Sequence, residues 1–168
     1  MNEERAPIER QLALEIRSGR FGFAVIEGST LLDWGACAFD TSGLDYAMSR
    51  LAFLLRIYRP ATVVARTTRR GADDFSKNAA KVLRKIRNKL ERGDVRFVLL
   101  ARHDVHNFFS KRGCGNKHEI AGVIADRFSQ LKARVPKLRK PWDCESAITA
   151  VFDAIASVMA ADEIQVPG

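Results

Sequence analysis

The sequence predicts one α/β domain built on a five-stranded mixed sheet, in which the first three strands are antiparallel and helices flank the sheet. Three observations predict this class. The first forty residues hold three apolar, strand-like segments separated by short turns. The rest of the chain alternates helical periodicity with short apolar runs. A length of 168 residues, 46% of them hydrophobic, suits a single domain over residues 1–168.

The N-terminal third predicts an antiparallel meander. Residues 1–9 are polar, contain a proline and are expected to form a loose arm. Ser18-Gly19 and Gly28-Ser29 are typical turn residues, and strands joined by such short turns pair antiparallel. The three strands are expected at 11–17, 20–27 and about 30–39.

The middle of the chain predicts two rounds of helix followed by strand. Apolar residues recur at helical spacing from Leu44 to Tyr58, and Pro60 ends that helix near Arg59. A second amphipathic helix begins at Asp74 and is stopped by Gly93. The short apolar runs after the two helices predict strands buried on both faces, at 61–65 and 95–100.

Three helices are expected in the last third. The first spans about 103–112. The second begins after Asn116, which with Glu119 resembles a capping box, has an apolar face that reaches Leu131, and is closed by Val135-Pro136. The last runs from about Cys144 to Ala161 and leaves 162–168 as a frayed tail.

Two acids lie inside apolar segments. Glu15 stands among Leu, Ala and Ile in the first strand, and Asp153 stands in a last helix that is apolar almost all round. A carboxylate buried without a partner costs several kcal/mol, so a metal, a cation or water must hold each acid. We therefore expect the two acids, although distant in sequence, to meet in one site.

The charge of the chain indicates a polyanionic partner. A formal net charge of +8 makes nucleic acid the default partner, read by shape and backbone because no base-reading pattern is present. The cations concentrate in two segments, although a charged helix face is often merely solvated. The candidate nucleic-acid-binding residues are Arg69, Arg70, Lys77, Lys81, Arg84 and Lys85 in the first segment, and Lys137, Arg139 and Lys140 in the second.

Several protein classes are disfavoured by the sequence. No apolar run is long enough for a membrane span, the N-terminus lacks a secretory pattern, and three widely spaced cysteines indicate reduced thiols. We therefore expect a cytoplasmic protein with no membrane partner. Glycine-rich phosphate loops of the Gly-x-x-x-x-Gly-Lys-Ser/Thr and Gly-x-Gly-x-x-Gly types are absent from the sequence, which disfavours nucleotide-binding enzymes.

The order of elements is that of the ribonuclease H-like fold, in which the first and fourth strands lie side by side. The stretch from Glu15 to Ile26, with a turn and then Gly-Phe-Ala-Val-Ile, resembles the opening of RuvC-type Holliday-junction resolvases. Phe152-Asp153-Ala154-Ile155-Ala156 resembles their closing helix. The resemblance implies endonucleolytic hydrolysis of branched DNA with Mg²⁺ or Mn²⁺ held by carboxylates, and a homodimer acting in DNA recombination and repair.

Two acids match the positions of acidic residues in the resolvases, and the residue at a third such position differs. Glu15 stands at the position of the first-strand acid and Asp153 at that of the last-helix acid, so both are candidate catalytic residues and metal ligands. The fourth strand of a resolvase ends in glutamate, whereas here Arg66 follows Ala65. Parallel neighbouring strands would place Arg66 beside Glu15, where a guanidinium pairs with carboxylates and keeps its charge.

Three functions remain open from the sequence. The first is a metal-dependent endonuclease, in which Arg66 turns outward to phosphate and Asp143 or Glu145 supplies the missing oxygen ligand. The second is a degenerate nucleic-acid-binding protein whose metal site is closed by a Glu15–Arg66–Asp153 ion cluster. The third is a structural subunit whose basic surface engages an acidic protein.

Overall fold

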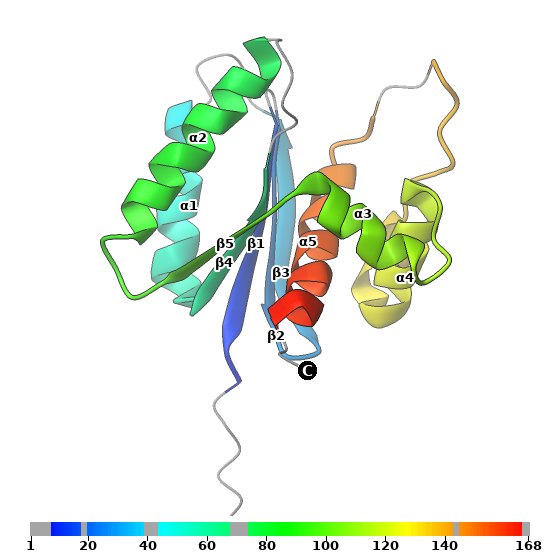
Figure 1. Ribbon diagram of the computed structural model, residues 1–168, viewed down its shortest axis with the longest axis horizontal. Helices are drawn as coiled ribbons and strands as arrows, with labels where there is room; N and C mark the ends of the chain where they lie inside the picture. Colours follow the sequence, from blue (N-terminus) through cyan, green and yellow to red (C-terminus); the bar gives the residue numbers. More distant parts are fainter. Residues whose placement is uncertain (1–7, 18–19, 39–43, 68–73, 143–144, 166–168) are drawn as a thin grey trace, which may run out of the picture.

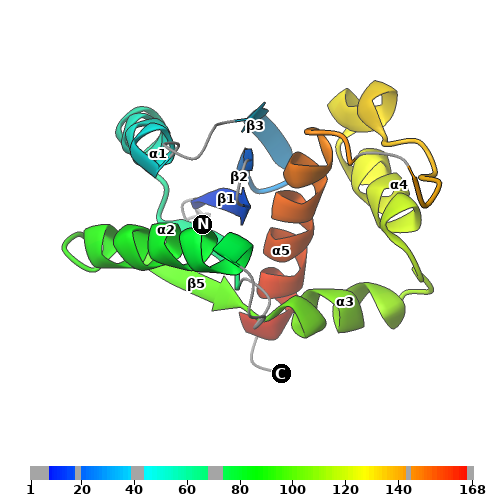
Figure 2. The same cartoon turned by 90° about the horizontal axis from the view of Figure 1, so that it is seen from above.

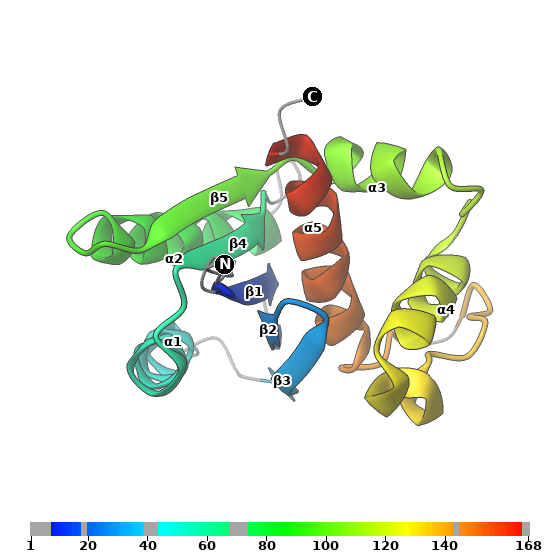
Figure 3. The same ribbon diagram turned by 90° about the horizontal axis from the view of Figure 1, so that it is seen from below.

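A computed structural model describes residues 8–17, 20–38, 44–67, 74–142 and 145–165. Its five strands form one mixed sheet in the order β3-β2-β1-β4-β5, seen in Figure 3. The first three strands pair antiparallel, whereas β1 pairs parallel with β4 and β4 with β5, which confirms the predicted sheet. The strands are β1 (Arg10–Arg17), β2 (Arg20–Glu27), β3 (Thr30–Ala38), β4 (Thr62–Arg66) and β5 (Arg96–Leu100).

The helices form layers on both faces of the sheet (Figure 1). Two of them cover one face, while α5 covers the other with α3 and α4 beyond it. The helices are α1 (Leu44–Tyr58), α2 (Asp74–Leu90), α3 (Arg102–Ser110), α4 (Lys117–Arg127) and α5 (Thr149–Gln165), with a short 3-10 helix η1 (Ser129–Arg134) after α4. Among the described residues, no helix combines the length and the apolar character that a membrane span needs.

Side-chain alternation along the strands divides the interior into two cores. In β1, Leu12, Leu14 and Ile16 pack toward α1 and α2, while Ala13 between them packs toward α5. Successive strand residues point to opposite faces, so the central strands are apolar on both. The acid at position 15 therefore shares the face of Ala13, the face that α5 covers.

The position of α5 depends on small residues beneath it. A Cβ atom on Gly22 would lie 2.6 Å from the Ala150 side chain and from its carbonyl carbon, so only glycine lets the start of α5 approach β2 this closely. The helix lies between the sheet and the pair α3 and α4 (Figure 2), which explains why it is buried nearly all round.

The predicted bounds of the last helix were wrong at both ends. It begins at Thr149 rather than near Cys144, because the carbonyl groups of residues 146–148 accept hydrogen bonds from residues only three positions further on, in a turn tighter than an α-helix. It continues to Gln165 rather than ending at Ala161. Its last turns are held by Gln11, which donates to Asp162 at 2.6 Å, and by the ion pair between Arg112 and Glu163.

The helix predicted to run from Asn116 to the closing Val135-Pro136 is divided in the structure. Asn116 caps α4 by accepting a hydrogen bond from the Glu119 backbone at 3.0 Å, whereas the Glu119 carboxylate accepts from the Gly115 backbone, one residue before the cap. The helix ends at Arg127, and Phe128 is extended, with φ −119° and ψ 90°. This break lets both Phe128 and Leu131 enter the core on the α5 face.

Candidate functional site: a buried ion cluster beside a basic groove

The site lies at the carboxyl ends of β1 and β4. Their register pairs Leu14 with Ala65, so the next residues along the two parallel strands, Glu15 and Arg66, are neighbours. Because Leu14 and Ala65 both face α1 and α2, Glu15 and Arg66 turn toward α5. The sheet thus presents an acid and a base side by side to the helix that carries Asp153.

Arg66 contacts both predicted acids. Its Nη2 atom lies 2.5 Å from Glu15 Oε1 and 3.5 Å from Asp153 Oδ2. The side chains of Glu15, Arg66 and Asp153 are only 6%, 10% and 10% exposed, so the charges are largely removed from water. The geometry is the one that the ion-cluster hypothesis expects.

A second guanidinium, that of Arg17, was not predicted. Its Nε donates to Glu15 Oε1 at 3.1 Å, its Nη1 donates to Glu145 and its Nη2 donates to Asp153. One side chain therefore connects β1 with the start of α5 and with the segment before it. The sequence signal was present, because Arg17 is two residues beyond Glu15 in a strand and so lies on the same face.

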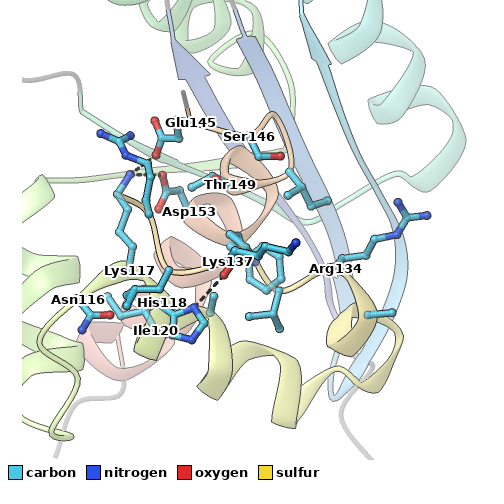
Figure 4. Close-up of a pocket in the computed structure, with 18 of the residues that line it drawn as sticks. Asn116, Lys117, His118, Ile120, Arg134, Lys137, Glu145, Ser146, Thr149 and Asp153 are labelled. Atoms are coloured by element: carbon cyan, nitrogen blue, oxygen red, sulfur yellow. Dashed lines mark hydrogen bonds and ion pairs between the residues drawn. The ribbon is translucent and has the colours of Figure 1, made fainter. Parts of the chain in front are cut away.

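Lys117, the first residue of α4, completes the arrangement (Figure 4). Its Nζ lies 2.7 Å from Glu145 Oε1 and 3.3 Å from Asp153 Oδ2. We call these six side chains the ion cluster: the carboxylates Glu15, Glu145 and Asp153 with the cations Arg17, Arg66 and Lys117. Its formal charges balance.

Two members of the ion cluster have pKa values shifted toward their charged forms. Burial acts to lower the pKa of Arg17, but Asp153, Glu15 and Glu145 together raise it above its usual value. Burial acts to raise the pKa of Glu145, but hydrogen bonds and charge from Lys117 and Arg17 lower it below its usual value. Mutual attraction therefore outweighs desolvation at both groups.

The ion cluster does not fit a divalent metal as it is arranged. Mg²⁺ and Mn²⁺ bind hard oxygen ligands in an octahedral shell. Here Glu15 Oε1 already accepts from Arg17 and Arg66, and Asp153 Oδ2 lies against Arg17, Arg66 and Lys117. Within the described part of the chain, no group of three His, Cys, Asp or Glu side chains is arranged as a metal site.

A groove of about 1000 Å³ opens from the ion cluster. It lies between α4, the segment after η1 and the start of α5, with Glu145 and Asp153 at one end (Figure 4). Ile120, Ile148 and Phe152 add apolar lining. Five cations also line it: Arg102, Lys117, Arg134, Lys137 and Arg139.

The predicted basic residues separate into two places. Lys137 and Arg139 line the groove, and Lys140 follows them on the exposed surface. Lys81, Arg84 and Lys85 are exposed on α2, which covers the opposite face of the sheet, so the two basic segments do not form one surface around the groove. Four predicted positions lie outside what the structure describes: Arg69, Arg70, Asp143 and the side chain of Lys77.

The strand order and helix layers are those of the ribonuclease H-like fold. Comparison with solved structures identifies the type of this fold. Thermus thermophilus RuvC bound to a Holliday junction substrate superimposes with a TM-score of 0.66 and 13% identity, over 90% of this chain and 91% of that one. The fowlpox virus resolvase in complex with Holliday junction DNA superimposes with a TM-score of 0.61 and 8% identity, over 94% of this chain and 99% of that one. The yeast mitochondrial Holliday junction resolvase superimposes with a TM-score of 0.64 and 10% identity, over 94% of this chain and 79% of that one.

The chain therefore has the RuvC-type resolvase fold, as its sequence predicts. No protein-family model and no curated protein sequence matches it. At such low identities the likeness establishes the fold, and any activity must be argued from the side chains of the site.

Proposed function

We propose that this protein binds branched or structured DNA and does not cut it, because the metal site of a resolvase-type fold is here closed by cations. One observation carries the proposal. At the ends of β1 and β4, Arg17 donates to both acids that the resemblance assigns to metal binding, Glu15 and Asp153, while Arg66 donates to Glu15 and pairs with Asp153 at 3.5 Å.

The energetics favour the closed site. A metal ion could approach Glu15 and Asp153 only after Arg17 and Arg66 had moved away, and a buried carboxylate left without a partner in that step costs about 3–5 kcal/mol. The guanidiniums would also have to find other anions, since arginine does not lose its charge. The ion cluster is therefore a stable alternative to a metal centre.

The DNA-binding part of the proposal rests on charge and fold. The chain carries a formal net charge of +8, and five cations line a groove whose two carboxylates are already paired. Phosphate contacts of this kind give affinity without sequence specificity. Two of the similar structures are complexes with Holliday junction DNA, which favours a branched partner.

A metal-dependent endonuclease is the second candidate. It is favoured by the position of Glu145, which shares Arg17 and Lys117 with Asp153 and could supply a third carboxylate. Bound DNA would have to draw both guanidiniums onto its phosphates and so release the acids for Mg²⁺ or Mn²⁺. The role of Asp143 as an alternative ligand stays a prediction.

One experiment separates the two candidates. A labelled four-way DNA junction and a duplex of equal length are incubated with the protein, with and without Mg²⁺ or Mn²⁺, and followed by gel-shift and by denaturing gel. The proposal expects binding that weakens steeply with salt, with the junction intact in either metal. Glu15→Gln and Asp153→Asn serve as matched variants that remove one charge each.

Paired, metal-dependent nicks that disappear in both variants would reject the closed-site proposal and establish the endonuclease. Failure to bind either DNA at any salt concentration would instead favour the third alternative, a subunit that engages an acidic protein. Nicks that persist in both variants would point to a contaminating nuclease, which a second purification step would remove.

The homodimer implied by the resemblance is also a proposal. The outer side of α1 exposes Tyr46, Phe53 and Ile57, at 46%, 41% and 52%, although single exposed apolar residues are common on monomers. Light scattering coupled to size exclusion, with and without junction DNA, would measure the mass directly. A mass of twice the 18.8 kDa chain would support the dimer.

A further inference from the structure

Residues 134–142, which we call the basic strap, border the groove and combine cations with exposed apolar side chains. Leu138 is 70% exposed and Trp142 is 77% exposed. The cations around them are Arg134, Lys137, Arg139 and Lys140. A partner that offers both apolar faces and negative charge would bury these apolar side chains and pair with the cations around them.

Trp142 lies three residues from the groove lining on either side in the chain. In the chain it lies between Arg139 and Glu145, which both line the groove, and three residues span at most about 10 Å. Its ring already accepts a cation, because Lys140 Nζ lies 5.6 Å from the ring centroid. The indole is thus presented to solvent beside a positive charge, the combination that favours stacking on a nucleobase.

The basic strap is attached to the body of the domain at its first part. The His118 ring nitrogen Nδ1 lies 2.8 Å from the Pro136 carbonyl oxygen, which holds the strap against α4 (Figure 4). The Arg134 guanidinium lies 5.9 Å from the Trp34 ring centroid, which holds it against β3. The cations of the strap are therefore presented by a supported backbone, which lowers the entropy cost of binding.

We propose that the basic strap and the groove bind a single-stranded segment of nucleic acid, with a base stacked on Trp142 and the phosphates on Lys137 and Arg139. The inference rests on the proposed function and specifies which form of DNA binds at this part of the site. In a duplex the base faces are covered by their neighbours, so an exposed indole and an apolar groove lining gain contacts only with unstacked bases.

Intrinsic fluorescence gives a direct test, because the chain has two tryptophans. In Trp34→Phe, Trp142 is the only indole and reports stacking by quenching. The probe is oligothymidylate about eight nucleotides long, compared with an abasic strand, a duplex and poly-glutamate of matched charge. Oligothymidylate should quench saturably, whereas the abasic strand should bind through phosphate with little quenching.

The affinity of each variant for oligothymidylate completes the test. Trp142→Ala should weaken binding about tenfold, while Trp142→Phe, which keeps an aromatic face, should stay within about threefold of the parent. The abasic strand should bind the parent and Trp142→Ala equally. This difference separates loss of stacking from misfolding, since an unfolded variant would bind neither oligothymidylate nor the abasic strand.

Equal affinity of Trp142→Ala and its parent for oligothymidylate would overturn the inference, and so would equal quenching by the duplex. Tighter binding and stronger quenching by poly-glutamate would overturn it in favour of an acidic protein partner. A gel-shift with the four-way junction is run in parallel. Junction binding without oligothymidylate binding would reject this inference and leave the proposed function standing, whereas loss of both would reject the two together.

Discussion

The ion cluster and the basic strap border the same groove, and they use the same kinds of cation in opposite ways. In the ion cluster, Arg17 and Arg66 are 19% and 10% exposed and each donates to carboxylates. In the strap, Lys137 and Arg139 are exposed at the groove surface. The difference is one of burial and of the number of acids within reach.

That difference predicts different consequences for the two regions. A buried cation among carboxylates cannot be removed without leaving unpaired charge, so it contributes to stability and to the closure of the site. An exposed cation contributes little to stability but attracts phosphate, and its contribution depends on salt. The comparison holds only if substitutions in the two regions affect separate measurements.

The largest effect is expected for Arg17→Met. The variant removes the guanidinium that bonds Glu15, Glu145 and Asp153, and leaves three carboxylates to two cations. We expect a loss of about 3 kcal/mol in the free energy of unfolding, measured by denaturant titration.

Arg96→Met is the matched control for that substitution. Arg96 is also a strand arginine, but it is exposed at the start of β5, so its replacement should change stability by less than about 0.5 kcal/mol. A loss in Arg17→Met no larger than in Arg96→Met would contradict the comparison, because it would show that the cluster charges are screened like surface charges.

The second prediction concerns metal binding. In Arg17→Gln/Arg66→Glu, a third carboxylate stands beside Glu15 and Asp153, and the main competing cations are gone. Mn²⁺ at about a hundred times its dissociation constant should then stabilise the variant by about 2.7 kcal/mol, read as a rise in the unfolding midpoint. The parent and Arg17→Gln/Arg66→Gln should not respond. Equal stabilisation of the parent would show that its ion cluster admits metal.

Much of the fold was predictable because it depends on local patterns. Alternation and helical spacing located the strands and helices of the first hundred residues to within a residue or two. The bounds of α5 could not be predicted in the same way. A helix that is buried all round has no alternation of apolar and polar faces, so the sequence does not show where the helical pattern ends. Its end depends on Gln11 and Arg112, which belong to other elements.

The candidate site was predictable to the extent that strand geometry decides it. The neighbours Glu15 and Arg66 follow from the pairing of parallel strands, and Arg17 could have been added by the same alternation. Lys117 carries no such signal, since only the packing of α4 beside α5 brings its amine to Asp153. The separation of the two basic segments onto opposite faces of the sheet is likewise a property of the tertiary structure.

A third, smaller effect is expected from pH. The pKa of Glu145 is lowered in the folded protein, so its charge contributes stability above the ordinary glutamate value of 4.5, and this contribution is lost as pH falls through the lowered pKa. Glu145→Gln lacks the charge at every pH. The difference in unfolding free energy between the parent and Glu145→Gln should therefore be constant near neutrality and shrink below about pH 4.5. A difference that stays constant into strong acid would show that Glu145 is not held by Lys117 and Arg17.

The smallest effect is expected for substitutions in the basic strap. It is measured as a change in how the affinity for DNA depends on salt concentration. Lys137→Ala and Arg139→Ala should leave the free energy of unfolding within about 0.5 kcal/mol of the parent, since both side chains are exposed. Each should reduce the slope of log affinity for oligothymidylate against log salt by about 0.7, the value for one phosphate contact on a single strand. Lys85→Ala on α2 is the control, because that helix covers the other face of the sheet and should leave this slope unchanged. If Lys85→Ala lowers the slope as much as Arg139→Ala does, the DNA follows the general charge of the protein rather than the groove, and the two regions no longer differ in the way that their burial predicts.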